Sequence, residues 1–299
     1  MTAVEQTAEQ RAESRSRSLG LGAVAFAILA FSLGSTLVKL AETPGVTVAF
    51  WRMVVCSFTW AVIMRIIDTR WLTWADLRAA VVPGVLFGLN ITLFFTGVTK
   101  TSVPHAEFIG AMTPLILVPL GAVVLHERIN PRALMFGLIS VAGLVLVLGF
   151  SPAGGDATLA GDLIIGLAVM CWAAYLMSSR SLRMGRSVAT VMASITPIAT
   201  ITILPLVLIS GEVVTITWRS VVFILILAVL TGTAAHGFIV FAQRSVPVST
   251  ISIMQVAQPA IAVLWSVLFL SQTVRPIQLV GMALVMVGLI AVTVLSRRG

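Results

Sequence analysis

The chain has 299 residues, of which 59% are hydrophobic and 10% are charged, and its mean hydropathy is +1.08. A soluble domain typically carries about 25% charged residues, so this composition excludes a soluble globular protein, a disordered chain and a charged coiled coil. The net charge of +8 arises from basic residues scattered between apolar runs, which indicates membrane topology signals and no nucleic-acid partner. The composition predicts an all-α membrane protein, because helices satisfy the backbone of continuous apolar segments within a bilayer.

Ten apolar runs are long enough to cross the hydrocarbon core, which takes roughly 20 residues of helix. Turn-forming residues separate several of them, as at Asn130-Pro131 and Arg275-Pro276. The first run is too long for a signal-peptide core and no small-residue cleavage site follows it, so we expect a retained first helix. The predicted spans are 19–41, 47–67, 79–99, 103–125, 132–150, 160–179, 188–210, 219–241, 248–270 and 277–296.

Lysine and arginine are distributed unequally between the two sides of this predicted bundle. If the N-terminus is cytoplasmic, fourteen of the nineteen basic residues fall on the inner side: Arg11, Arg15, Arg17, Arg65, Arg70, Arg78, Arg128, Arg132, Arg180, Arg183, Arg186, Arg244, Arg297 and Arg298. The five near the outer ends are Lys39, Arg52, Lys100, Arg219 and Arg275. Since basic residues favour the cytoplasmic side, we expect a multi-pass protein of the cytoplasmic (inner) membrane with both termini in the cytoplasm.

The chain also contains an internal repeat. The stretch 102–114 aligns with 245–259, since each begins with Ser-Val-Pro and ends with a proline, and Gly143 then falls opposite Gly288. Five spans lie in each half. Because an odd number of spans inserts the second half upside down, we predict two inverted five-helix repeats, an arrangement typical of secondary transporters. The predicted units are a polar tail (1–18), a first repeat (19–150), an outer linker (151–159) and a second repeat (160–299).

Several short motifs, in this order, resemble the EamA domain, which occurs twice in ten-span members of the drug/metabolite transporter superfamily. They are Arg52, Met112-Thr113-Pro114, His126-Glu127-Arg128, Gly161-Asp162, Trp172 and Arg180. The second copy departs from the family pattern, because Gln272-Thr273 stand where the family usually has Glu-Arg. The resemblance implies an exporter whose central cavity is lined by spans one, three, four, six, eight and nine.

Polar and aromatic side chains fall on helical stripes of the spans expected to line this cavity. A buried amide or imidazole is costly in hydrocarbon unless it finds a partner or water, so a set of them is most stable around a wet cavity. The alternative is that these groups pair with one another and hold the helices together. The candidate substrate-binding residues are Ser32, Ser35, Asn90, Phe94, Thr113, Trp172, Tyr175, His236, Gln255, Gln258 and Trp265.

Charges and prolines inside the spans are candidates for gating or energy coupling. Glu107 is the one acid placed well within a span, where it would pair with Lys39 or Arg52 as an outer gate or carry a coupling proton. For Lys39 and Arg52 the alternative is that each side chain reaches the headgroups from a helix end. Pro114 and Pro259 occupy equivalent repeat positions, where paired kinks would provide bending points for alternating access.

Two further residue types bear on assembly and on cofactors. Glycines in spans five and ten, among them Gly143, Gly281 and Gly288, allow close helix contact. They pack either the two halves of the chain or a second protomer, so a monomer and a homodimer both stay open. Cys56 and Cys171 lie in separate apolar runs and form neither a disulfide framework nor a metal motif. We therefore expect no metal and no cofactor.

These features favour a secondary transporter that exports a small metabolite such as an amino acid, with a small-molecule substrate, the lipid bilayer and candidate coupling protons as its partners. The sequence contains no G-x-x-x-x-G-K-[ST] loop, so we expect no direct use of ATP. The alternatives are an uncoupled facilitator of a drug-like, nucleobase or sugar-type metabolite and a non-transporting membrane scaffold. An enzyme is not expected, because the three histidines form no H-E-x-x-H motif.

Overall fold

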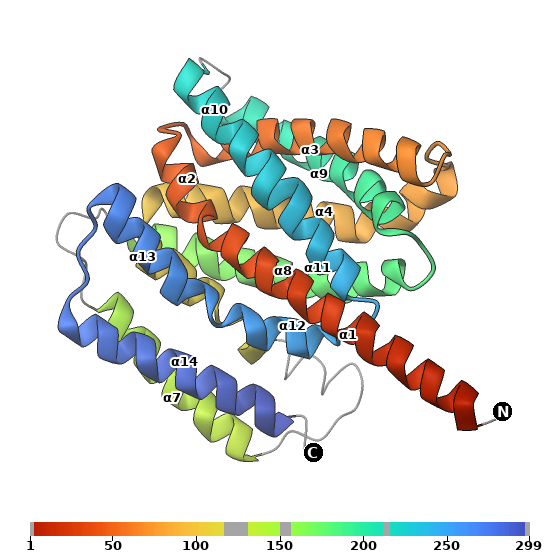
Figure 1. Cartoon of the computed structure of the whole chain (residues 1–299). Coiled ribbons are helices and arrows are strands. Elements are labelled where there is room, and N and C mark those ends of the chain that lie inside the picture. Colours follow the sequence, from red (N-terminus) through yellow and green to blue (C-terminus); the bar gives the residue numbers. More distant parts are fainter. Residues whose placement is uncertain (1–2, 117–130, 150–156, 212–215, 297–299) are drawn as a thin grey trace.

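The computed structural model describes residues 3–116, 131–149, 157–211 and 216–296, and the regular structure within these ranges is helical (Figure 1). The helices are α1 (Ala3–Ser32), α2 (Gly34–Leu40), α3 (Gly45–Ile67), α4 (Trp74–Lys100), α5 (Val103–Gly110), α7 (Pro131–Leu148), α8 (Leu159–Arg183), α9 (Val188–Ser210), α10 (Trp218–Ile226), η1 (Leu227–Ala235), α11 (His236–Ala242), α12 (Val248–Gln255), α13 (Gln258–Leu270) and α14 (Pro276–Ser296). Helix lies within every predicted span, although the ends of the fourth and fifth spans fall outside the described residues. Six described helical stretches are long and apolar enough to cross a membrane, and three shorter ones are also apolar. The predicted all-α membrane fold is confirmed.

The helices of the two halves pack in pairs that follow the repeat. α3 packs on α9, α5 on α13 and α7 on α14, and each of these pairs joins equivalent spans of the two halves. α4 packs on α8, and the equivalent helices of the opposite halves, α11 and α1, also contact each other. Figure 1 shows the N-terminal end of α1 and the C-terminal end of α14 directed toward the same side of the bundle. An exchange of the two halves therefore reproduces the pattern of contacts, as inverted five-helix repeats require.

Glycines bring α7 and α14 into close contact. A Cβ atom at Gly143 would lie 2.7 Å from the carbonyl oxygen of Gly281, and one at Gly281 would lie 2.7 Å from that of Gly143. Gly288 lies against Ser140, whose hydroxyl donates to the carbonyl of Val285 at 3.4 Å. These glycines therefore pack the last span of one half on the last span of the other, which is one of the two roles predicted for them. Figure 1 shows this pair beside the rest of the bundle.

Local sequence explains where one helix begins earlier than expected. α4 begins at Trp74, before the predicted span 79–99, because Thr73 and Asp76 form a capping box. The hydroxyl of Thr73 accepts from the Asp76 amide at 3.2 Å, and the Asp76 carboxylate accepts from the Thr73 amide at 3.2 Å. α1 likewise includes the polar tail, since the helix continues without interruption from its first described residue to the end of its apolar part.

Four predicted spans are interrupted. The first divides into α1 and α2 at Leu33, and the eighth contains the π-helix η1 between α10 and α11. The fourth and ninth spans break at residues 111–112 and 256–257, directly before the helical turns that contain Pro114 and Pro259. The kinks predicted at these prolines are therefore complete breaks at equivalent repeat positions. A proline in the first turn of a helix needs no partner for its missing N–H, so it favours a new helix start there.

Candidate substrate pocket

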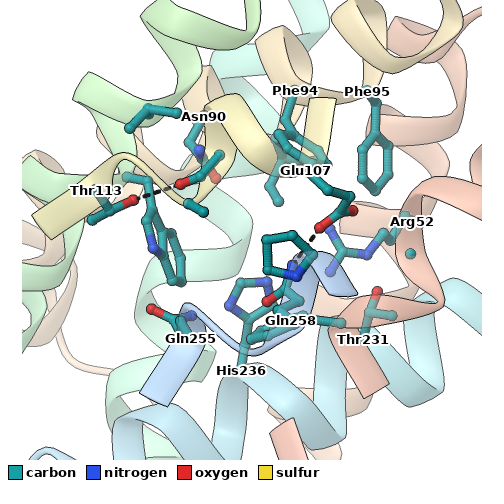
Figure 2. A pocket seen from close by; sticks show the side chains of 18 residues that line it. Arg52, Asn90, Phe94, Phe95, Glu107, Thr113, Thr231, His236, Gln255 and Gln258 are labelled. Carbon is teal, nitrogen blue, oxygen red and sulfur yellow. Dashed lines mark hydrogen bonds between the residues drawn. The ribbon is translucent and has the colours of Figure 1, made fainter. Parts of the chain in front are cut away.

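A pocket lies among helices of both halves (Figure 2). Its wall includes the six spans implied by the family resemblance and, in addition, the second span through Arg52. No lining residue comes from α9, the counterpart of the second span in the other half. The lining residues are Phe31, Gly34, Arg52, Asn90, Ile91, Phe94, Phe95, Glu107, Gly110, Ala111, Thr113, Val169, Trp172, Thr231, His236, Gln255, Gln258 and Pro259.

Seven of the eleven candidate substrate-binding residues lie in this wall, and four do not. Those in the wall are Asn90, Phe94, Thr113, Trp172, His236, Gln255 and Gln258. Those outside the wall are Ser32, Ser35, Tyr175 and Trp265. Of the residues predicted for gating or coupling, Arg52, Glu107 and Pro259 line the pocket, whereas Lys39 and Pro114 do not. The fourth and ninth spans therefore both contribute residues at or beside their breaks to the wall, although only one of the two prolines is part of it.

Glu107 joins three spans at the pocket. Its side chain is only 2% exposed. One carboxylate oxygen accepts a short hydrogen bond from the hydroxyl of Ser35 on α2, and the other accepts from Nε2 of Gln258, in the first turn of α13, at 2.9 Å. Of the alternatives predicted for Glu107, the ion pair with Arg52 is not formed, since Arg52 takes part in none of the four ion pairs among the described residues. Arg52 is instead directed toward the backbone of η1.

An aromatic cluster forms one wall of the pocket. The ring of Trp172 lies 5.2 Å from Tyr175, 5.7 Å from His236 and 6.4 Å from Phe31, measured between ring centroids. Trp172 is half-buried and faces the pocket, whereas Tyr175 is fully buried and stacks on Phe87 at 4.8 Å behind it. Trp172 can therefore offer a ring face to a ligand, while Tyr175 supports it from the protein interior.

Three polar side chains of the wall differ in how far the protein satisfies them. Asn90 donates through Nδ2 to the carbonyl of Ala168 at 2.9 Å, which fixes α4 on α8. Nδ1 of His236 and Oε1 of Gln255 are buried and have no hydrogen-bond partner among the described residues. Buried polar atoms are normally paired, so these two are available to a ligand or to water in the pocket.

The candidates outside the wall hold helices together. Nε1 of Trp265 donates to the hydroxyl of Ser32 at 3.0 Å, which connects α13 to α1. Thr113 in the wall has a similar local bond, since its hydroxyl donates to the carbonyl of Gly110 at 2.9 Å across the break in the fourth span. Lys39 lies in the last turn of α2 and does not line the pocket. For Ser32 and Trp265 the helix-pairing alternative is the one that the contacts support.

Sequence reasoning did not single out several wall residues. Phe31 and Phe95 are aromatic residues of spans that were expected to line the cavity, so their type and position were a usable signal. Thr231 lies in η1, where the wider π-helical turn changes which side chains face inward. The spacing rules of an α-helix do not apply within such a segment, so its facing residues could not be read from the sequence.

These features define a polytopic helical membrane protein with a pocket between two inverted repeats. The profile of the EamA-like transporter family matches residues 18–149 and 159–294, and the chain belongs to this family. The two matched segments confirm the predicted resemblance with its two copies of the domain. A comparison with curated proteins gave no match. A solved structure described only as "Crystal structure of protein" has a similar fold, with a TM-score of 0.67 and 19% identity over 95% of this chain and 98% of that chain.

Proposed function

We propose that this protein is a secondary transporter that exports a small metabolite, such as an amino acid, by alternating access between its two repeats. The observation that carries this proposal is that residues next to two helix breaks, at 111–112 and 256–257, line the wall of one pocket. In transporters with inverted repeats, substrates bind at such discontinuous helices near the membrane midplane. Membership of the EamA-like transporter family supports the same conclusion.

The pocket offers two kinds of contact to a substrate. Phe94 and Trp172 present aromatic surface, while the amides of Gln255 and Gln258 present hydrogen-bonding groups. Glu107 connects this site to helix movement, because its two hydrogen bonds join α5 to α2 and α13. A proton on Glu107 would convert one accepted hydrogen bond into a donated one, which changes the contacts that hold the three helices together.

A binding screen followed by a flux assay tests this proposal. Purified protein in lipid nanodiscs is heated with pools of amino acids, nucleobases and sugars, and we expect one class to raise the melting temperature, since a ligand of the folded state stabilises it. The compound identified is then loaded into proteoliposomes, and its efflux is compared with that from protein-free liposomes. A ligand that stabilises the protein without measurable efflux would show a binding protein or scaffold and would contradict transport.

We further propose that both termini are cytoplasmic, in the inner membrane. In a Cys171→Ala background, Thr99→Cys places a thiol at the exposed outer end of α4, and Met184→Cys places one at the exposed end of α8. An impermeant thiol reagent should modify Thr99→Cys in intact cells and Met184→Cys only after the membrane is permeabilised. The Cys171→Ala parent, which retains buried Cys56, gives the background level. Labelling with the opposite sidedness would invert the proposed topology.

A further inference from the structure

Arg52 is a buried cation in the wall of the pocket. Its side chain is 1% exposed, and it is the largest fully buried side chain in the described part of the protein. Nη1 of the guanidinium is buried and has no hydrogen-bond partner among the described residues. A lysine or arginine near a helix end can extend to the headgroups, but a side chain this deeply buried does not. The headgroup alternative therefore does not describe Arg52.

The contacts around Arg52 orient its side chain and leave Nη1 without a hydrogen-bond partner among the described residues. The guanidinium carbon lies 5.2 Å from the ring centroid of Phe95, and Nε donates to the carbonyl of Leu227 in η1 at 3.4 Å. Gly232 lies directly beside this contact, since a Cβ atom there would lie 3.2 Å from Nε of Arg52 and closer still to Sγ of Cys56. The bond at Nε is the only hydrogen bond that the described residues give to this guanidinium. Figure 2 shows Arg52 on the same side of the pocket as Thr231.

No acid in the described residues compensates this charge by direct contact. The four ion pairs found there do not include Arg52. Glu107, the one acid among the described lining residues, is hydrogen-bonded to Ser35 and Gln258. An arginine remains charged at every physiological pH, and a buried charge without an acid to neutralise it is destabilising. The protein therefore maintains a costly cation at the surface of the pocket, which a bound anion would compensate.

We propose that Arg52 binds the carboxylate of the substrate, so that this end of the pocket is an anion subsite. Arg52 is the only Lys or Arg among the described lining residues, which suits a single carboxylate better than a phosphate dianion. Nδ1 of His236, also buried and unpartnered in the wall, is a second polar atom available there. The aromatic rings of Phe94 and Trp172 remain for an apolar body. This proposal rests on the pocket being the transport site and specifies a small monocarboxylate as its ligand class.

The test compares two probes that have the same body and nearly the same shape but differ in charge. They are 3-phenylpropionate and its neutral amide, 3-phenylpropanamide, and each is titrated against the whole protein in nanodiscs by calorimetry and by thermal shift. We expect the wild-type protein to bind the carboxylate at least about tenfold more tightly than the amide, the size of effect typical of a hydrogen bond to a charged group. The wild-type comparison needs no variant, so it decides the question even if a substitution prevents folding.

Variants then assign the preference to one residue. In Arg52→Gln we expect the preference for the carboxylate to disappear while the affinity for the amide changes by less than about threefold, and Arg52→Lys should retain only part of it. The matched control is Arg78→Gln, because Arg78 is exposed and does not line the pocket. It should leave the preference unchanged.

Three other outcomes of these titrations would contradict the proposed anion subsite. Equal binding of the two probes by the wild-type protein would show that Arg52 is not used for a carboxylate, while the binding itself would still support the pocket as a ligand site. A preference that survives in Arg52→Gln would assign it to another group. Binding of neither probe would also reject the monocarboxylate subsite, and the proposed transport function would then be judged separately by its own screen and efflux assay.

Discussion

Replacing Glu107 with glutamine is expected to reduce flux that is driven by a pH gradient by at least about tenfold, while exchange of substrate for substrate continues. The amide has nearly the same size as the carboxylate but cannot gain or lose a proton at physiological pH. Its oxygen can still accept from the Ser35 hydroxyl or from Gln258, and its NH2 group can donate to the other partner after that partner rotates. The variant therefore retains the contacts between the three helices and loses only the ability to bind and release a proton at this position.

The measurement uses proteoliposomes that contain the compound identified in the screen. Efflux is recorded with an imposed pH gradient, and counterflow is recorded without one. The matched control is Asp162→Asn, because Asp162 is an acid at the start of α8 that bonds to Thr101 and His105 and does not line the pocket. We expect pH-driven flux to survive in that control. If it also survives in Glu107→Gln, another group carries the proton, and if the wild-type protein ignores the gradient, it is a facilitator.

The second large effect is expected for Trp172→Ala, which should weaken substrate binding by roughly tenfold or more. Trp172 presents its ring to the pocket, and stacking on an aromatic ring combines area burial with a specific geometry. The ring also contacts Phe31, Tyr175 and His236, so some loss of stability will accompany the substitution. Removing a buried tryptophan typically costs about 3–5 kcal/mol, and a side chain that faces a pocket should cost less because the space left is already open.

Trp60→Ala separates binding from packing. Trp60 is 6% exposed, packs against Gly237 of α11 and does not line the pocket. We expect this variant to lower the melting temperature at least as much as Trp172→Ala while its ligand affinity stays close to that of the wild type. Calorimetric titrations and melting curves of both variants provide the comparison. The assignment of Trp172 to the site would fail if its substitution lowered stability and left ligand affinity unchanged.

The architecture was predictable because the bilayer imposes simple requirements on a sequence. A span must be apolar over its whole length, so hydropathy located the helices, and the matching Ser-Val-Pro and proline positions of the two halves located the repeat. The ends were less predictable, as α4 shows, because the capping box of Thr73 and Asp76 lies outside the apolar run. Helical spacing also identified the faces of α4 and α8 that carry Asn90 and Trp172 into the pocket wall.

The contacts within the site were less predictable, because they depend on how the helices rotate against one another. A similar depth in the membrane suggested Arg52 as a partner for Glu107, but depth does not specify the direction in which a side chain points. The side chain of Arg52 lies against η1, where it donates to the carbonyl of Leu227 and lies beside Gly232. Glu107 is instead bonded to two neutral side chains from other spans. Neither arrangement has a signature in hydropathy or in helical spacing.

The two helix breaks also give the pocket an electrostatic character that belongs to the main chain. At the break in the ninth span, α12 ends in carbonyl groups and α13 begins with amide groups, so opposite partial charges lie next to each other at Gln255 and Gln258 in the wall. The break in the fourth span repeats this arrangement at Gly110 and Thr113. Substitution of side chains leaves these partial charges in place. Members of such a family can therefore exchange the residues that select a substrate while they keep a polar centre in the membrane.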